Sequence, residues 1–366
     1  MPFDPTDIVL SLVKIAVVLG VLLSVTPIMV WVERRGSALI QDRPGPNRVG
    51  PMGLFQSLAD ALKFIMKEDI IPAGAHKWIY TLAPAFGLLP ALTAIAVVPW
   101  GRPFVLRERE IFGRTVFEGG RWFHPIIADV SVGILVVFAL ASIGVYGIVA
   151  AGWASNNKYS MLGAIRASAQ MISYELSLTL AALSVLLAAG SLRLTDIVWQ
   201  QSGRFLLFDA IPLPAWNVFS PALWLAFIVF VVSAFAETNR LPFDFAEAEA
   251  ELVAGYHTEY SSMKFALFFM AEYMAMATMS ALIVTLFLGG WDIPYYQEPP
   301  TFAGFLLSAL AFVAKVSFVL FVFVWIRWTL PRLKYDLLMR LGWKVFLPLA
   351  LLNIVIVAAF IAARWL

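Results

Sequence analysis

The sequence has few charged residues, no cysteine and little histidine. Charged residues occupy 14% of its 366 positions, against about 25% in soluble globular domains. A soluble chain could not cover its surface with so few charges. The absence of cysteine excludes disulfides, thiolate metal sites, iron–sulfur ligation and cysteine nucleophiles within this chain. With three histidines we expect no metal site, and the net charge of +2 offers no strongly basic face for nucleic acid.

Long apolar runs take the place of the missing charges. Hydrophobic residues make up 61% of the chain, and the mean hydropathy is +0.83. A membrane-spanning helix needs about 20 mostly apolar residues, and continuous rather than alternating runs favour helices over barrel strands. We therefore predict an all-α polytopic membrane protein, with about eight transmembrane helices in a single integral membrane domain over 1–366. The predicted spans are 8–32, 78–99, 126–150, 161–189, 219–237, 262–289, 302–326 and 344–364.

The distribution of lysine and arginine predicts the orientation of these spans. The loops that follow the first, third, fifth and seventh spans contain more of these residues than the loops that follow the second, fourth and sixth. Loops rich in lysine and arginine stay in the cytoplasm. We therefore expect the odd-numbered loops to be cytoplasmic and both termini to lie on the opposite, periplasmic side.

The first cytoplasmic loop, 33–77, contains a segment that is too short and too charged to span the membrane. Within 51–67, apolar residues recur at helical spacing, whereas Asp60, Lys63 and Lys67 occupy other positions. This pattern predicts an amphipathic helix that lies at the membrane interface. The apolar residues of the pattern are Leu54, Leu58, Ala61, Leu62 and Ile65.

Ionisable residues inside the predicted spans are candidates for function, because charge is costly in the membrane. Glu175 is about 14 residues into the fourth span, and so roughly 21 Å deep. Glu272 and Lys315 are similarly deep in the sixth and seventh spans, and Asp129 is near the start of the third. An apolar environment favours the neutral form of a carboxylate, so such groups can take up and release protons. The alternative is pairing between helices, for example of a glutamate with Arg166 or Lys315.

An acidic cytoplasmic loop, 237–261, follows the fifth predicted span directly. Within 236–251, five carboxylates accompany the single arginine Arg240, and phenylalanine and leucine side chains are interleaved with them. This interleaving argues against a simply solvated loop and favours either a funnel for protons or a surface for a cytoplasmic partner. The carboxylates are Glu237, Asp244, Glu247, Glu249 and Glu251.

A second polar cluster lies at the cytoplasmic end of the first span. From the charge pattern alone it could be a positively charged anchor, as cytoplasmic loops commonly carry. Beside an amphipathic helix, it could also frame the mouth of a cavity that opens to the lipid. Its members are Glu33, Arg34, Arg35, Gln41, Arg43 and Arg48.

These segments resemble a known family. The motif GPNRVGP in the first loop and the motif AETNRLPFDFAEAEAELV after the fifth span are highly specific in combination, and the likeness extends over most of the chain. The chain resembles the quinone-site membrane subunit of proton-pumping NADH:quinone oxidoreductase, respiratory complex I, which is called the H subunit in the bacterial enzyme.

The resemblance implies a role for most of the charged residues. Residues that match the family's quinone chamber are Glu33, Arg34, Arg43, Asp60, Arg240 and Asp244. Residues that match its acidic loop and buried proton path are Asp129, Tyr174, Glu175, Glu237, Glu247, Glu249, Glu251 and Glu272. The resemblance assigns no residue of this chain to catalysis or to a metal.

The resemblance also implies partners and a location. The substrate would be ubiquinone or menaquinone, drawn from the lipid bilayer of a bacterial inner membrane. FMN and iron–sulfur clusters would belong to partner subunits, and this chain would hold no cofactor and no complete active site of its own. Its neighbours would be the quinone-reducing subunits of the peripheral arm and the antiporter-like membrane subunits. The segment 102–125 looks longer than is usual in the family, and contact with neighbouring subunits is the one role we assign to it.

Two alternatives stay open at the level of sequence. The same scaffold serves in related machines, such as a membrane-bound hydrogenase or a quinone reductase with another electron donor. A stand-alone proton-coupled transporter could also use buried carboxylates, but such carriers commonly show internal repeats, and none is apparent in this sequence.

Overall fold

The computed structural model describes residues 5–363, apart from 107–108, 112–113, 118–119, 208–210, 247–250, 252 and 297–298. Within these residues, seven helical stretches are long and apolar enough to cross a membrane, and a shorter apolar stretch covers Pro221–Glu237. The predicted all-α polytopic fold is confirmed. The helices of the bundle are α1 (Pro5–Ile40), α3 (Lys77–Ala94), α4 (Gly133–Ala154), α5 (Lys158–Ala189), α7 (Trp224–Glu237), α9 (Ser262–Phe287), α10 (Phe302–Thr329) and α12 (Leu347–Ala362).

Short elements connect these helices. Antiparallel strand pairs, which the sequence did not predict, join β1 to β4, β2 to β3 and β5 to β6. The strands are β1 (Phe104–Val105), β2 (Arg109–Ile111), β3 (Arg114–Phe117), β4 (Trp122–Phe123), β5 (Arg204–Leu207) and β6 (Ile211–Pro214). The short helices are η1 (Pro51–Gly53), α2 (Gln56–Met66), η2 (Ile95–Val97), α6 (Leu194–Gln200), η3 (Asn217–Phe219), η4 (Pro221–Leu223), η5 (Gly255–His257), α11 (Tyr335–Arg340) and the π-helical η6 (Leu341–Phe346).

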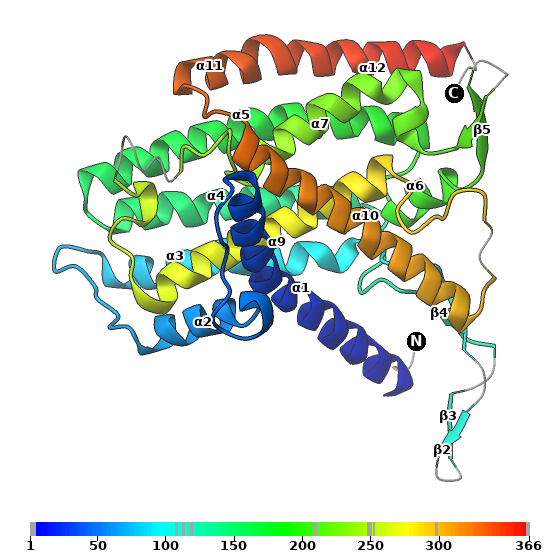
Figure 1. Cartoon of the computed structure of the whole chain (residues 1–366). Coiled ribbons are helices and arrows are strands. Elements are labelled where there is room, and N and C mark those ends of the chain that lie inside the picture. Colours follow the sequence, from blue (N-terminus) through cyan, green and yellow to red (C-terminus); the bar gives the residue numbers. More distant parts are fainter. Residues whose placement is uncertain are drawn as a thin grey trace.

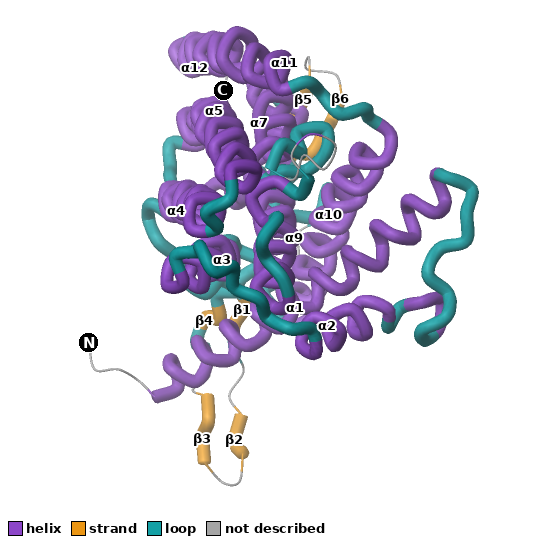
Figure 2. The backbone as a smooth tube through the Cα atoms, turned by 90° about the vertical axis from the view of Figure 1, so that its left-hand side faces the viewer, coloured by secondary structure: helices purple, strands orange, loops and turns teal. Residues whose placement is uncertain are grey.

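Helix α9 lies at the centre of the bundle. It is the most buried of the spans and contacts α1, α3, α7 and α10 (Figure 1). Helix α5 packs against α4, α7 and α12 to form the second half of the bundle (Figure 2). Both ends of the chain lie at the right-hand end of the bundle in Figure 1, near the strand pairs.

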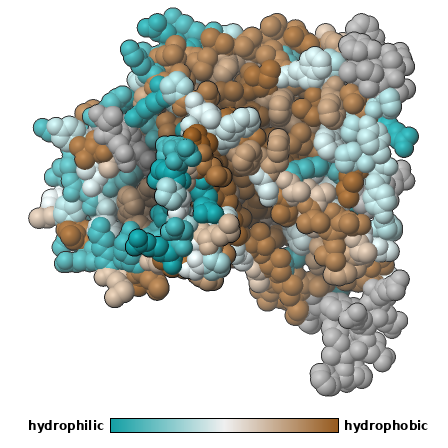
Figure 3. All heavy atoms as spheres, in the orientation of Figure 1, coloured by the Kyte–Doolittle hydropathy of each residue, from teal (hydrophilic) through white to brown (hydrophobic). Residues whose placement is uncertain are grey.

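The outer faces of the bundle are apolar. Large hydrophobic side chains such as Leu310, Phe318 and Val355 are more than half exposed in the isolated chain. Figure 3 shows hydrophobic residues over the broad faces of α10 and α12, whereas hydrophilic residues gather at the left-hand end, where α2 lies. Apolar surface this extensive is not stable in water and suits a membrane.

Two helix ends differ from the prediction. Helix α1 does not end at residue 32 but continues through Glu33 and Arg34 to Ile40, so the loop that follows it begins later than predicted. The last span extends toward the N-terminus, because α11 and η6 continue directly into α12. At the end of α1 the charged segment stays helical because Glu33 and Arg34 form ion pairs with residues of other elements.

The amphipathic helix α2 lies across the end of α1. The hydroxyl of Ser57 donates to the carbonyl oxygen of Pro27 at 2.8 Å, and the indole nitrogen of Trp31 donates to that of Met52 at 3.0 Å. These contacts fix both α2 and the turn before it against α1. The predicted amphipathic helix is confirmed, although it begins at Gln56 rather than at residue 51.

Candidate functional site: a buried charge cluster beside a cavity

Arg240 is the centre of the most buried charge cluster among the described residues. It follows α7 in the turn 236–243 and is only 5% exposed. Its Nε lies 2.7 Å from Oε1 of Glu272 on α9, and its Nη1 lies 3.3 Å from Oε2 of Glu33 on α1. The guanidinium also lies over the ring of Tyr273, 4.3 Å from its centroid. The turn, α1 and α9 therefore meet at one side chain.

Glu33 receives two further partners. The hydroxyl of Tyr273 donates to its Oε2 at 2.8 Å, and Arg327 of α10 forms an ion pair with its Oε1. Glu33 and Glu272 thus balance Arg240 and Arg327. This balance explains how charges can stay in the interior, because a buried charge that loses its partner costs about 3–5 kcal/mol.

The electrostatics keep Arg240 cationic. Burial by itself would lower the pKa of its guanidinium, but the carboxylates of Glu272 and then Glu33 outweigh that effect and raise the pKa above its usual value. The positive charge is therefore a fixed feature of the site, and the groups around it must adapt to it.

The predicted chamber residues do not all lie together. Glu33 and Arg240 belong to the buried cluster, as described. Arg34, the next residue of α1, reaches instead to α2, where its Nη1 lies 2.6 Å from Oδ2 of Asp60. Arg43 joins neither pair: it donates to the side chains of Gln41 at 2.7 Å and Ser37 at 3.4 Å in the turn after α1.

Asp244 lies in the loop beyond Arg240. Its backbone carbonyl oxygen accepts a hydrogen bond from Arg332, whose guanidinium lies 5.0 Å from the ring centroid of Phe245. The loop is thereby tied to the segment between α10 and α11.

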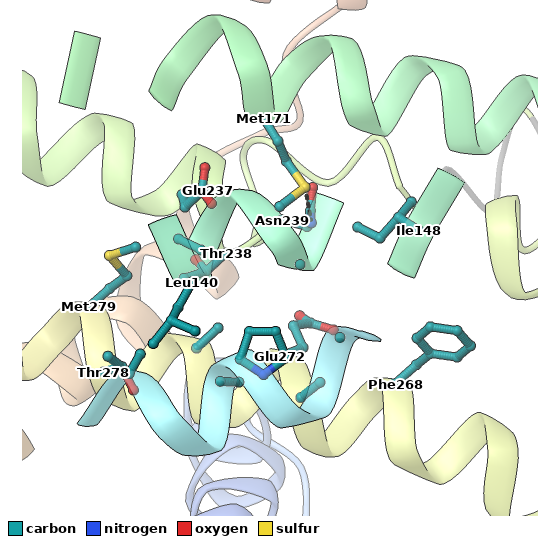
Figure 4. Close-up of a pocket in the computed structure, with 18 of the residues that line it drawn as sticks. Leu140, Ile148, Met171, Glu237, Thr238, Asn239, Phe268, Glu272, Thr278 and Met279 are labelled. Atoms are coloured by element: carbon teal, nitrogen blue, oxygen red, sulfur yellow. Dashed lines mark hydrogen bonds between the residues drawn. The ribbon is translucent and has the colours of Figure 1, made fainter. Parts of the chain in front are cut away.

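A cavity of about 110 Å³ lies beside the cluster and is lined by Glu237 and Glu272. A buried water needs roughly 10–15 Å³ of such space, so the cavity has room for several. Figure 4 shows Glu237, Thr238 and Asn239 on its upper side and Glu272, Thr278 and Phe268 on its lower side. Glu237 is 6% exposed, and one of its carboxylate oxygens has no hydrogen-bond partner.

Two other residues of the predicted proton path, Glu175 and Tyr174, are neighbours on α5 but contact different parts of the bundle. Glu175 of α5 accepts a hydrogen bond from Ser142 of α4 and is close enough to Glu237 for the two charges to interact. Tyr174 points elsewhere: its hydroxyl donates to the carbonyl oxygen of Leu338 at 2.9 Å. The structure therefore brings Glu175, Glu237 and Glu272 into one region and leaves Tyr174 on another face of α5.

Asp129 lies outside this region. It precedes α4, at the opposite end of the bundle, where its Oδ1 lies 3.4 Å from Nε of Arg193 and accepts a hydrogen bond from Thr195 at 3.0 Å. Asp129 is thus paired at a helix end, and its place on the proton path stays a prediction.

The acidic loop is only partly described. Glu251 forms an ion pair with Arg166 of α5 at 2.6 Å, so the predicted pairing of Arg166 is with a loop carboxylate rather than with one inside the membrane. Glu247 and Glu249 lie outside the described residues.

Lys315 has another role than that of a glutamate's partner. Its ammonium group donates to the backbone carbonyl oxygens of Leu288, Gly290 and Asp292 at 2.7–3.0 Å, and lies 4.0 Å from the ring centroid of Trp216. These carbonyls belong to Leu288, which ends α9, and to the turn just beyond it, and the positive charge suits the C-terminal end of the helix dipole.

Sequence reasoning missed Tyr273, Arg327 and Ser142. In the sequence, Arg327 resembles an interfacial anchor at the end of a span. Tyr273 follows Glu272 and carries no charge, so nothing in the sequence marks it as a site residue. No group of three or more histidine, cysteine, aspartate or glutamate side chains is placed to hold a metal among the residues that the structure describes.

Comparison with known proteins identifies the family. The family model for NADH dehydrogenase matches residues 13–358. Two bacterial H subunits of NADH-quinone oxidoreductase align with 98% of this chain and over 98% of their own length. The one from Geobacter metallireducens is 48% identical over 359 residues, and the one from Koribacter versatilis is 45% identical over 357 residues. The chain is also 45% identical to NADH-quinone oxidoreductase subunit 8 of Rhodothermus marinus, over 94% of this chain and 95% of the relative. The chain with the buried Arg240 cluster therefore belongs to the H-subunit family of NADH-quinone oxidoreductase, a family of membrane subunits of respiratory complex I.

Proposed function

We propose that this chain forms the lateral entrance and one wall of a quinone chamber, and that it couples quinone reduction to proton translocation through buried carboxylates. One observation carries the proposal. Glu272 is at once an ion-pair partner of Arg240 and a wall of the cavity that Glu237 also lines. A change of charge at the cluster therefore acts directly on a group that faces the cavity.

The entrance is proposed to lie between α1 and α2. The pair of Arg34 and Asp60 joins these helices at their polar side, and Leu58, Leu62 and Ile65 leave an apolar face of α2 exposed. A quinone has a polar ring and an apolar tail, so a passage with one polar and one apolar side suits it. The quinone comes from the bilayer, and its species, ubiquinone or menaquinone, is set by the host membrane.

The chemistry of this chain is binding and proton handling rather than electron transfer. Electrons would reach the quinone from FMN and iron–sulfur clusters of partner subunits, and the chamber residues Glu33, Arg34, Arg43, Asp60, Arg240 and Asp244 would hold or guide the quinone. Protonation of the reduced quinone draws on nearby acids. Glu272, Glu237 and Glu175 would then pass the change in charge toward the antiporter-like subunits, and the loop with Glu247, Glu249 and Glu251 would link chamber and path.

The orientation and location also belong to this proposal. The odd-numbered loops, including the end of α1 and the turn 236–243, face the cytoplasm, and both termini face the periplasm of a bacterial inner membrane. The distribution of lysine and arginine supports this orientation. The named bacterial relatives support the location.

The test uses the assembled enzyme in proteoliposomes, with Glu272→Gln as the variant and Asp196→Asn as the control. Asp196 accepts a hydrogen bond from Ser191 near α6, away from the cavity. We expect the Glu272 variant to lose at least about tenfold in quinone reductase turnover, or about 1.4 kcal/mol in transition-state free energy, and to lose proton pumping with it. The control should keep both. Full turnover with full pumping in the Glu272 variant would refute the proposed role.

A further inference from the structure

One face of α5 contacts the described residues of the segment 236–256 at several points. Residues on this face recur at three- and four-residue spacing, which places them in one line along a helix. The Ser160 hydroxyl donates to the carbonyl oxygen of Tyr256 at 2.6 Å, and Arg166 binds Glu251. A Cβ on Gly163 would come within 2.9 Å of backbone atoms of Gly255 and Tyr256, so this helix face touches the segment directly.

Gln170 is the member of this line that binds the turn 236–243. Its side chain is fully buried. Its amide nitrogen donates to the carbonyl oxygens of Ala236 at 2.8 Å and Phe243 at 2.7 Å, and Oδ1 of Asn239 lies 3.3 Å away. One amide group therefore joins the two ends of the turn in which Arg240 lies.

The position of this amide matters for the charge cluster. Arg240 lies between the two bonded carbonyls in sequence, and its guanidinium must reach Glu33 and Glu272 on two different helices. Without the amide, the carbonyls of Ala236 and Phe243 would lose a buried donor. Each carbonyl would keep only its backbone donors, from Thr238 and Asn239 to Ala236 and from Phe245 to Phe243. Losing a buried hydrogen bond at both ends of the turn is unfavourable, so the turn would relax and the guanidinium would move with it.

We propose that Gln170 is a positioning residue: its amide sets the conformation of the turn 236–243 so that Arg240 holds Glu33 and Glu272 together. This role rests on the proposed function of the cluster. It explains why a fully buried amide stands on α5 at a place where an apolar side chain would pack as well. The role is specific to an amide, because methionine offers no N–H and glutamate would bring a carboxylate toward three oxygen acceptors.

The experiment compares Gln170→Met with Gln201→Met in the assembled enzyme. Gln201 is a matched control: it is also buried, and its amide nitrogen also donates to two backbone carbonyls, of Ile197 and Thr285, at the far end of α9. Turnover and the KM for a short-chain quinone are measured per assembled complex. Electron cryomicroscopy then gives the distance between the Arg240 guanidinium and the Glu272 carboxylate.

We expect Gln170→Met to lower turnover about tenfold and to lengthen the Arg240–Glu272 contact beyond ion-pair distance, while Gln201→Met changes neither. In an Arg240→Lys background, where the placed guanidinium is already gone, adding Gln170→Met should lower turnover less than about twofold. If Gln170→Met does not assemble, Gln170→Asn keeps the amide but is one methylene too short to reach both carbonyls, and the same results are expected of it.

Two results would overturn the inference. One is an intact Arg240–Glu272 contact with normal turnover in the Gln170 variant that assembles. The other is a Gln170 effect of equal size with and without Arg240→Lys. Failure of the proposed function looks different, because Arg240→Lys alone would then leave turnover and pumping unchanged.

Discussion

The hydroxyl group of Ser262 lies 2.8 Å from the carbonyl oxygen of Phe64 and 2.9 Å from that of Lys67. It therefore caps the C-terminal end of α2 from the first turn of α9, nearly two hundred residues away in the chain. Ser261 adds contacts with Glu68 and Ile70, and Lys264 forms an ion pair with Asp69 at 2.8 Å. The amphipathic helix is thus fastened to the helix that carries Glu272.

Replacing Ser262 by alanine should loosen that attachment. The last carbonyls of α2 would lose a donor, at a cost of about 1 kcal/mol. Residue 262 has a positive φ of 53°, and alanine is no better suited to this conformation than serine. Because α2 borders the proposed entrance, we expect the KM for quinone to rise about threefold to tenfold with a smaller change in turnover. Ser168→Ala is the control, since its hydroxyl binds only the carbonyl of Ile165 on its own exposed helix face. An unchanged KM would separate α2 from the entrance.

Acid should destabilise the protein through His257. This residue of η5 is buried against the rings of Tyr256, Phe265 and Phe269, its Nδ1 has no hydrogen-bond partner, and burial lowers its pKa to about 4. An unfolded histidine has a pKa of about 6.5. Between about pH 6.5 and about pH 4, the unfolded chain binds a proton at His257 and the folded chain does not. The free energy of unfolding therefore falls by about 3 kcal/mol as the pH falls through this range.

His257→Phe keeps the aromatic packing and removes this titration. We expect the wild-type complex to lose thermal stability as the pH falls from about 7 to about 4, and the variant to lose less over the same range. Melting temperatures measured at several pH values, with the two proteins compared at each pH, provide the test. Parallel curves would show that His257 does not contribute.

Lys315 should matter for stability and not for proton transfer. Lys315→Met would leave three carbonyl oxygens at the end of α9 without their charged donor, and we expect a loss of about 2–4 kcal/mol in stability. Turnover and pumping per assembled complex should stay within about twofold of the wild type. A variant that assembles normally but no longer pumps would show instead that the ammonium group takes part in the proton path.

The sequence predicted most of the fold because long apolar runs and the periodicity of α2 are local signals. It placed Glu175 and Glu272 in the interior by their depth in those runs. It missed the partners of these carboxylates because partners come from other elements: Ser142 from α4, Arg240 from the turn after α7 and Arg327 from α10. Depth in a span also did not predict the partner of Lys315, because its ammonium group binds a backbone carbonyl oxygen at the end of α9.

The end of α1 shows the same limit. The charges of Glu33 and Arg34 look like the end of a span, because a hydropathy scale treats each charged residue as solvent-exposed and without a partner. In the structure Glu33 is enclosed by two arginines and a tyrosine, so the helix continues past it. The roles of the site residues in quinone binding and proton transfer stay predictions, because contacts between side chains do not by themselves define a reaction.

The four charges of the Arg240 cluster come from four separate parts of the chain: α1, the turn 236–243, α9 and α10. Two unit charges about 4 Å apart interact by about 4 kcal/mol in surroundings of intermediate polarity, which is a large part of what holds a protein folded. If one of these groups gains or loses a proton, the charges of the remaining three are no longer balanced. If the proposed function holds, we expect this imbalance to exert a force between the helices that carry these charges.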